Sequence, residues 1–297
     1  MTQICTGDEL RAPSAGLRDE VLGLLPPIKV ASAFLGGSLI EGFGNHTSDL
    51  DLLALLYAPP TSDDLAATRH DYVVTVGPRT IVVSSAGGRR SDTELWTLDY
   101  HRRWSSKLAT ADMTSGPHII DPPLAWIEFV TDLRIGVPIV GDELVEELRA
   151  KFPWTQLAKF LMIRNEHLAN THIEDAAGAL SAGDAGTAML SSRDALAHAV
   201  DAYLAGAGET NCKPKWRTRK LARTAEADLF DLYLDAELDT SREAGDLLAS
   251  ARRRILAAQD FLIRAHRAIV DRSDAEMRIA TNVLAVPPSW QVVNAPG

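Results

Sequence analysis

The stretch from Gly36 to Leu52, GGSLIEGFGNHTSDLDL, decides the fold of this chain. It follows an apolar run at 30–35 and leads into a second one at 49–56, so we expect two buried strands joined by a glycine-rich connection. Asp49 and Asp51 are two positions apart, and residues two apart in a strand point to the same face. The sequence therefore predicts two neighbouring carboxylates at the start of the second strand.

Two such carboxylates repel each other unless a cation lies between them. Mg²⁺ suits this position because proteins bind it through one or two carboxylates together with substrate phosphates. The first strand ends in Gly36, Gly37 and Ser38, where glycines let backbone N–H groups approach an anion and the serine hydroxyl adds a donor. The spacing predicts a nucleoside triphosphate held over a metal ion.

This segment resembles the signature of the DNA polymerase β-like nucleotidyltransferase superfamily, which consists of a strand, Gly-Gly or Gly-Ser, a short interval, and then acid, apolar, acid. The resemblance implies two Mg²⁺ ions at Asp49 and Asp51. It also implies that a nucleoside monophosphate, expected to be AMP from ATP, moves to a hydroxyl of a small molecule and releases pyrophosphate. It assigns the phosphate contacts to Gly36, Gly37, Ser38 and Ser48.

Members of this superfamily are similar in having a third carboxylate on a later strand. Here residues 80–85 are β-rich, 86–88 form a turn, and 91–96 can return as the partner strand of a hairpin. Glu94 fits the family's apolar, acid, apolar pattern and is expected to hold metal or act as a general base. Asp92, on the same face, is the alternative.

Two further expectations concern the tip of this predicted hairpin and the residues that follow it. Thr97 is expected to cap a helix that carries Asp99 in its first turn. Arg89 and Arg90 lie at the hairpin tip, where we expect solvated side chains.

Hydrophobic periodicity changes along the chain and predicts its organisation. Strands and short helices alternate up to about residue 108, and long helical patterns then replace the strands. We therefore expect an α/β (α+β) core with a mixed sheet at 1–121, an all-α helical bundle at 122–285 and an irregular tail at 286–297. The helical patterns cover 123–134, 142–151, 154–180, 187–204, 215–223 and 244–270. In outline this order resembles that of aminoglycoside nucleotidyltransferases.

Two features of the bundle suggest function. The basic run at 213–220 resembles a lysine-containing loop that two-domain nucleotidyltransferases direct at the triphosphate, which points to Lys213 and Lys215. Arg193 and His198 are spaced as in the ribonuclease motif of HEPN domains, which are often coupled to minimal nucleotidyltransferases. The alternative function is therefore a HEPN-type ribonuclease or toxin–antitoxin component. Packing on an amphipathic helix also explains this pair.

Composition limits the class of protein and its partners. The formal net charge of −10 opposes an extended nucleic-acid surface and favours a small-molecule acceptor. No apolar stretch is long enough for a membrane span and the first residues do not read as a secretory signal, so a cytoplasmic location is expected. Cys5 and Cys212 have no metal-ligand spacing and are predicted to be free thiols. Either a monomer or a homodimer is compatible with the sequence.

Overall fold

The structure is a computed structural model that describes residues 7–86, 89–113, 120–239 and 244–272. The chain forms two compact units. The first comprises residues 1–110 and 122–153, and the second comprises residues 111–121 and 154–297. The expected tail at 286–297 and Cys5 lie outside the described residues.

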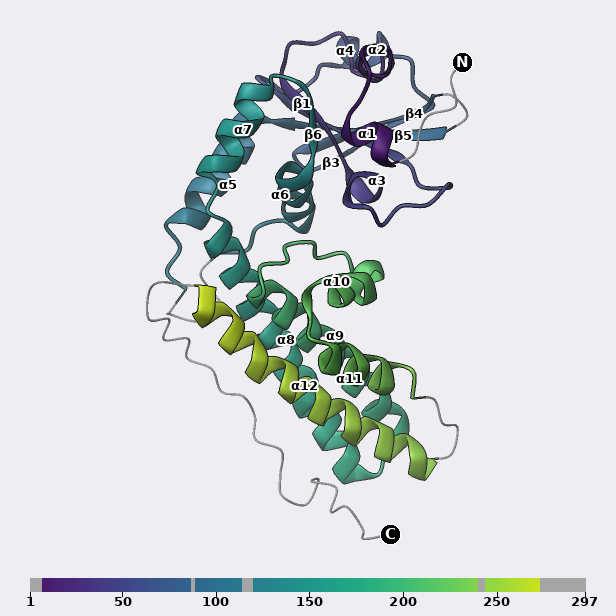
Figure 1. The fold of residues 1–297 in the computed structure, drawn as a ribbon, viewed down its shortest axis with the longest axis vertical. Coiled ribbons are helices and arrows are strands. Elements are labelled where there is room, and N and C mark those ends of the chain that lie inside the picture. The colour runs from purple at the N-terminus through teal and green to yellow at the C-terminus, as the bar shows by residue number, and fades with distance from the viewer. Residues whose placement is uncertain (1–6, 87–88, 114–119, 240–243, 273–297) are drawn as a thin grey trace. The chain divides into compact units, whose positions relative to one another are not determined.

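A six-stranded mixed sheet forms the centre of the first unit (Figure 1). Its spatial order is β3-β4-β5-β2-β1-β6. The neighbouring strands are antiparallel except for β2 and β5, which run parallel. The strands are β1 (Val30–Gly36), β2 (Leu50–Leu56), β3 (Tyr72–Val76), β4 (Arg79–Ala86), β5 (Arg89–Thr97) and β6 (Val137–Val140). The mixed sheet expected for the α/β core is confirmed, and so is the β4–β5 hairpin.

Both faces of this sheet are covered. On one face, Leu35, Leu52 and Leu95 share a buried core with residues of α1 (Gly7–Arg11) and α2 (Ala15–Leu22). On the other face, Phe34 and Trp96 pack against Phe129, with ring centroids 5.8 and 5.4 Å apart. Phe129 belongs to α6 (Leu124–Ile135), which Figure 1 shows below the sheet. Alternating side chains along each strand thus supply two separate cores.

Three of the remaining helices of this unit lie between strands along the chain, namely α3 (Gly37–Glu41), α4 (Ser62–Ala66) and α5 (Leu98–Ala109). The fourth, α7 (Asp142–Lys151), follows β6. Thr97 caps α5 by accepting the Tyr100 N–H, and Asp99 lies in the first turn, as expected from the sequence. The negative charge there complements the helix N-terminus.

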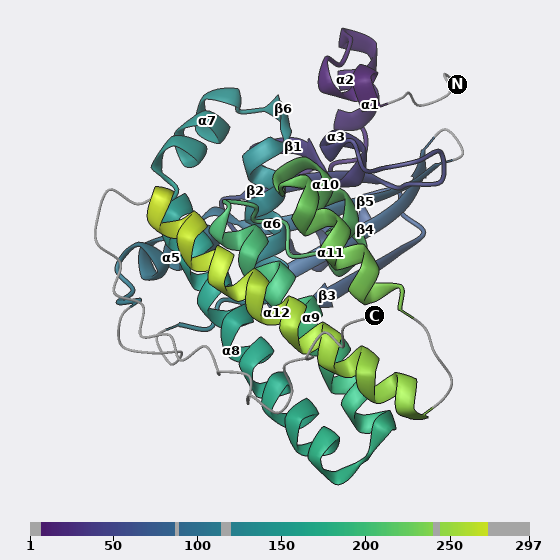
Figure 2. The same cartoon turned by 60° about the horizontal axis from the view of Figure 1, so that its bottom comes forward.

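The second unit is helical. Three long helices, α8 (Trp154–Ala182), α9 (Ala185–Gly206) and α12 (Ala244–Arg272), lie alongside one another (Figures 1 and 2). Alanines dominate the buried face of α9, which lets the helices pack closely. The shorter elements are η1 (Pro214–Trp216), α10 (Arg217–Thr224) and α11 (Ala227–Glu237). Among the described helices, none combines the length and apolar character needed to cross a membrane.

The boundary between the units differs from the expected one. We expected the first domain to end at residue 121, but the structure groups 122–153 with the sheet. The reason is that β6 pairs with β1 and α6 packs against it, so this segment completes the first unit rather than starting the helical one. A four-residue strand between two helical patterns gives little periodicity by which to recognise it.

Candidate active site

Gly36, the last residue of β1, and Gly37, the first residue of α3, form a turn that we call the glycine corner. In the antiparallel register, Gly36 is opposite Asp51 of β2. Gly37 has φ +71°, a left-handed conformation that favours glycine, and a Cβ at this position would overlap the Asp51 carboxylate. A Cβ at Gly36 would lie 2.7 Å from Leu53 Cδ1. Both glycines are therefore required by close approach of the backbone to the start of β2.

Carboxylates from two adjacent strands share one face of the sheet. Asp49 directly precedes β2 and Asp51 is its second residue. Because β2 and β5 are parallel, with Asp51 opposite Asp92 and Leu53 opposite Glu94, the side chains of Asp51, Asp92 and Glu94 point to the same side. Asp49 lies 3.8 Å from Arg90, which also binds Asp92. We call Asp49, Asp51, Asp92 and Glu94 the acidic row. Of the two aspartates on which the sequence interpretation depends, Asp51 thus shares a face with Asp92 and Glu94.

The register separates the two candidates for the third carboxylate. Asp92 is the direct cross-strand neighbour of Asp51, whereas Glu94 lies one pair further along the sheet, beside Leu53. Glu94 also accepts hydrogen bonds from Arg79 at 3.1 Å and from Trp96 Nε1 at 3.2 Å, which hold it toward the aromatic core. The structure therefore brings Asp92 next to Asp51, and Glu94, the residue favoured from the sequence, is the more distant of the two.

Arg90 is a positively charged side chain that contacts two members of the acidic row, Asp92 and Asp49. Its Nε and Nη2 donate to the two oxygens of Asp92 at 2.7 and 2.8 Å, and Nε lies 3.8 Å from Asp49 Oδ2. The hydrogen bond and charge of Asp92 raise the pKa of Arg90. The side chain of Arg90 is exposed, as expected, and the hairpin register also places it two residues before Asp92 on the same face. Its side chain is 49% exposed, so solvent can reach it.

The donor set suits a hard divalent cation. Among the described residues, no group of three or more His, Cys, Asp and Glu side chains is arranged to hold a metal ion. Magnesium does not need three, because one or two carboxylates and substrate phosphates suffice. Asp49 and Asp51 supply carboxylate oxygens, and the absence of a Cβ at Gly37 leaves the space that the Asp51 carboxylate itself occupies. Asp49 and Asp51 therefore fit Mg²⁺, provided that the Arg90 side chain moves away from Asp49.

Three of the residues expected to contact phosphates make hydrogen bonds within the protein. The Gly37 N–H donates to Asp132 Oδ1 at 2.8 Å, so this amide is already used within the protein. Ser48 Oγ accepts the Asn45 N–H at 2.9 Å and shapes the loop before Asp49. The Ser38 carbonyl accepts the N–H groups of Phe43 and Gly44 and turns the chain after α3.

Asp132 is a residue of this region that the sequence did not reveal. It lies in α6, 95 positions after Gly37, and is 8% exposed. In the sequence it is one acid in the polar part of a helical pattern, and a single acid at that position carries no signal of its own. Only the tertiary fold brings it to the glycine corner.

Lys213 and Lys215 lie in the second unit, where Lys213 is the N-cap residue of η1 and Lys215 is within η1. Buried Lys220 donates to the Asn211 carbonyl at 2.6 Å and lies 3.8 Å from Asp201. Asp201 also accepts two hydrogen bonds from Arg217, at 3.1 and 2.7 Å. The Asn211 side chain in turn accepts the Lys213 N–H at 2.9 Å. The segment that carries both lysines is therefore fastened to α9 and α10, and the basic run is not simply a solvated face.

Arg193 and His198 make separate contacts inside the second unit. Arg193 is paired with Glu237 of α11. His198 Nδ1 lies 3.1 Å from Asn165 Oδ1, and its ring is stacked on His172 with centroids 5.6 Å apart. Burial lowers the pKa of His198. These contacts agree with a packing role for both residues.

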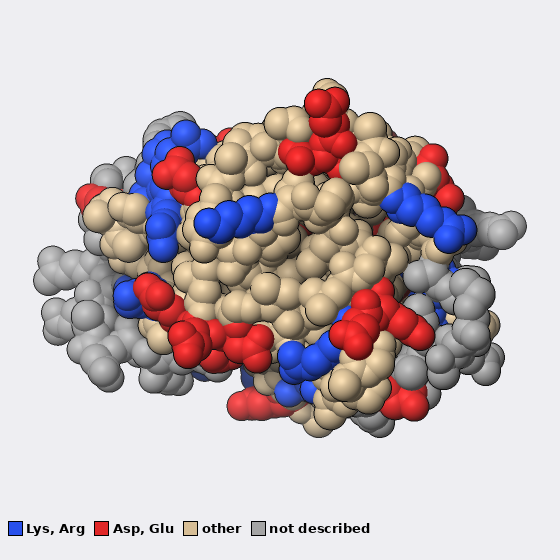
Figure 3. Space-filling view, turned by 90° about the horizontal axis from the view of Figure 1, so that it is seen from above, with Lys and Arg blue, Asp and Glu red and all other residues tan. Residues whose placement is uncertain are grey.

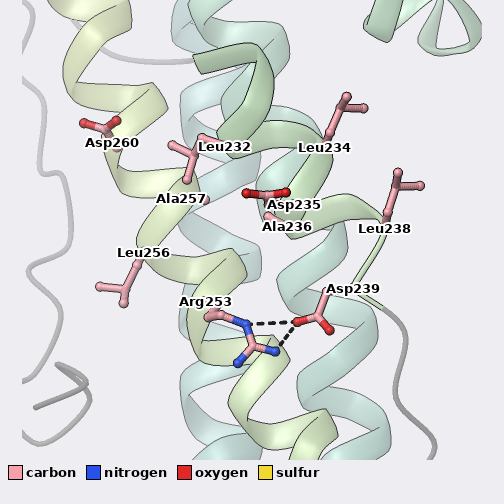
Figure 4. Close-up of a pocket in the computed structure, with 10 residues that line it drawn as sticks. All are labelled: Leu232, Leu234, Asp235, Ala236, Leu238, Asp239, Arg253, Leu256, Ala257 and Asp260. Atoms are coloured by element: carbon pink, nitrogen blue, oxygen red, sulfur yellow. Dashed lines mark hydrogen bonds and ion pairs between the residues drawn. The ribbon is translucent and has the colours of Figure 1, made fainter. Parts of the chain in front are cut away.

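The second unit also contains an open groove between α11 and α12 (Figure 4). Its apolar lining includes Leu232, Leu238 and Leu256, and Arg253 crosses one end to donate to Asp239. The other lining acids, Asp235 and Asp260, lie apart from this ion pair (Figure 4). The groove has no convergent set of reactive groups, and we assign no chemistry to it.

The charged side chains of one face are shown in Figure 3. Acidic and basic groups lie around a mostly uncharged centre on this face, and acidic groups adjoin one another at its lower left edge.

Comparison with known proteins finds a solved structure of low similarity. No family model matches the chain, and no curated protein matches it. Among solved structures, the chain is similar to a nucleotidyltransferase-like protein from Exiguobacterium sibiricum, with a TM-score of 0.46 and 12% sequence identity. The match covers 89% of this chain and 77% of that chain. At this level of similarity, the function has to be argued from the residues themselves.

Proposed function

We propose that the chain is a Mg²⁺-dependent nucleotidyltransferase that moves a nucleoside monophosphate from a triphosphate, with ATP as the expected donor, to a hydroxyl of a small molecule. The observation that carries the proposal is the pairing of Gly36 with Asp51, which brings the glycine corner against the acidic row. Asp92 adds a third carboxylate from the adjacent parallel strand. This arrangement joins a close backbone approach to a set of hard oxygen donors, as phosphoryl transfer requires.

The proposed residues have distinct roles. Asp49 and Asp51 would hold the cations, and Ser38 would contact the phosphates. When bound, Mg²⁺ would neutralise charge on the phosphoryl oxygens and favour ionisation of the attacking hydroxyl. The acceptor oxygen forms a bond to the α-phosphorus while the bond to the pyrophosphate oxygen breaks. The hydroxyl proton passes to a carboxylate base, for which Asp92 has the better position.

Lys213 and Lys215 are proposed to contact the triphosphate. Support comes from the sequence resemblance and from the fastened segment that carries them, since a fixed segment loses less conformational entropy when it binds an anion. Replacing both by methionine should raise the KM for the triphosphate more than it lowers kcat. An unchanged KM would contradict this assignment.

Pyrophosphate release tests the proposed reaction. The purified protein is incubated with Mg²⁺, each ribonucleoside triphosphate in turn, and a panel of small hydroxyl compounds. We expect release with ATP and at least one acceptor, and we expect Asp51→Asn to reduce it roughly a thousand-fold, because several kcal/mol of transition-state stabilisation are lost. Asp63→Asn, an exposed acid of α4, is the matched control and should keep full activity.

Two outcomes would contradict the proposal. One is full activity of Asp51→Asn. The other is a folded wild-type protein that neither binds a triphosphate nor releases pyrophosphate under any of these conditions.

No second function is proposed. The HEPN-type alternative depends on Arg193 and His198, and the contacts of these residues with Glu237, Asn165 and His172 give each of them a role within the bundle.

A further inference from the structure

Asp132 is a buried carboxylate that contacts both glycines of the corner. Its Oδ1 accepts the Gly37 N–H at 2.8 Å, and a Cβ built on Gly36 would lie 2.8 Å from the Asp132 Cβ. Burying a carboxylate is unfavourable unless hydrogen bonds compensate for the lost water. A hydrogen bond from a backbone N–H to an ionised acceptor is among the stronger ones in proteins. The Asp132 side chain thus fixes the position of Gly37.

Gly37 in turn limits the position of Asp51. The Cβ position of Gly37 coincides with the Asp51 carboxylate, so the glycine backbone and this carboxylate are packed directly against each other. The register of β1 and β2 places Gly36 opposite Asp51 as well. A shift of the corner away from α6 would therefore change the space in which the Asp51 carboxylate lies.

We propose that Asp132 is a positioning residue, which holds the glycine corner and thereby orients Asp51 toward a divalent cation. The inference rests on the proposed function, because it takes Asp51 as a metal ligand. The acting part of Asp132 is its acceptor oxygen, and its contribution reaches the cation through Gly37 and Asp51. Residues that orient a metal ligand typically change metal affinity by about 10–100-fold when they are replaced.

Two substitutions separate the acceptor from the charge. Asp132→Asn keeps an oxygen acceptor in the same place without the negative charge. Asp132→Glu keeps the charge but moves the acceptor by one methylene group. Asp132→Ala removes both and leaves the Gly37 N–H buried without its acceptor, a change that also destabilises the fold.

The measurement is the concentration of Mn²⁺ or Mg²⁺ that gives half of the maximal rise in melting temperature, with kcat and KM recorded in parallel. We expect Asp132→Ala and Asp132→Glu to raise this concentration about tenfold or more, and Asp132→Asn to stay close to the wild type. If the Ala variant does not fold, comparing the Asn and Glu variants still shows whether the position of the Asp132 acceptor oxygen sets the cation affinity.

A control separates loss of positioning from loss of stability. Arg149 holds the C-terminal end of the same helix by donating to the carbonyls of Leu133, at 2.7 Å, and Gly136. Arg149→Gln should lower the melting temperature without changing the half-saturating cation concentration.

Four results would overturn the role of Asp132. An Asp132→Glu variant that binds the cation like the wild type would show that acceptor position does not matter. If Asp132→Asn is as damaging as Asp132→Glu, the charge acts directly. A wild-type protein that no divalent cation stabilises would contradict the proposed function and this role with it, whereas normal cation binding by every Asp132 variant would contradict this role alone.

Discussion

At the scale of single residues, the parallel register of β2 and β5 distinguishes the positions of Asp92 and Glu94. Asp92 lies opposite Asp51, whereas Glu94 is held by Arg79 and Trp96. We expect Asp92→Asn to lower kcat about 100-fold or more, because the positioned base is lost, and Glu94→Gln to lower it by less than about tenfold. Single-turnover rates of pyrophosphate release with saturating Mg²⁺ measure the difference. The reverse order of effects would return the third carboxylate to Glu94.

A second residue-scale prediction concerns Arg90 and the binding of a cation at the acidic row. The Arg90 guanidinium binds both oxygens of Asp92 and lies 3.8 Å from Asp49, one of the proposed metal ligands, so its positive charge opposes a cation at Asp49. Arg90→Gln should therefore lower the concentration of Mn²⁺ that half-saturates the protein several-fold, as measured by titration calorimetry. Arg89→Gln, the neighbouring arginine, is the control and should have a much smaller effect. Weaker Mn²⁺ binding by Arg90→Gln would show that Arg90 orients Asp92 and does not compete with the ion.

The residue-level chemistry could be read from the sequence where it depends on local spacing. The i, i+2 separation of Asp49 and Asp51 requires only that the segment is extended, and the glycine requirement follows from close backbone approach. Asp132 and Arg90 depend instead on which strands are neighbours and in what register. The segment at 36–52 contains neither α6 nor the residues of β5. The contact of Asp132 with Gly37 and that of Arg90 with Asp92 are therefore visible only in the folded chain.

At the scale of secondary structure elements, α5 and α6 bury a histidine in an aromatic cluster. The ring of His101 is 2% exposed and lies within about 6 Å of the rings of Trp126, Phe129 and Phe152. Burial, with a smaller contribution from Arg102, lowers its pKa from 6.5 to about 4. The folded protein therefore keeps this imidazole neutral at a pH where the unfolded chain binds a proton.

The sign of the resulting pH dependence follows directly. Between pH 6.5 and about 4 the unfolded state binds more protons at this site, so the free energy of unfolding falls as the pH drops, by up to about 3 kcal/mol. His101→Phe should remove this part of the pH dependence, as measured by urea unfolding at about pH 7 and about pH 5. If both proteins lose the same stability over this interval, other groups cause the loss.

Element prediction from periodicity succeeded for long amphipathic or capped segments. The cap at Thr97, the β4–β5 hairpin and the long patterns that became α8, α9 and α12 follow from local chemistry. It failed for α11 and β6. The α11 segment, ADLFDLYLDAE, has Asp228, Asp231 and Asp235 on one face and Leu229, Tyr233 and Ala236 buried on the other, a helical period that the sequence interpretation missed. In contrast, β6 has too few residues to show a strand period.

At the scale of the whole molecule, the division into two units predicts which fragments fold. A fragment of residues 1–121 lacks β6, α6 and α7, so the aromatic face of its sheet loses Phe129 and the glycine corner loses Asp132. We expect this fragment to be unfolded or aggregated, and a fragment of residues 1–153 to unfold cooperatively. Circular dichroism and urea titration of the two fragments test this. A cooperative transition in the shorter fragment would place the boundary where the sequence suggested.

The order of the two units along the chain could be predicted, but their boundary could not. Segment 111–121 belongs to the second unit and 122–153 to the first, so the chain leaves the first unit and returns to it. Composition and periodicity report the local preference of each segment. They do not report which distant strand a short segment such as β6 will join.

The pairing of β6 with β1 also affects how the protein is made. Because β6 leaves the ribosome about a hundred residues after β1, one side of β1 has no native partner during that interval, and its N–H and C=O groups are exposed for pairing with other chains. Translation speed between the two strands, and any chaperone that shields the growing chain, should therefore strongly affect how much of the protein reaches the native state. A synonymous change that delays synthesis of residues 122–140 would lengthen the vulnerable period without altering a single side chain.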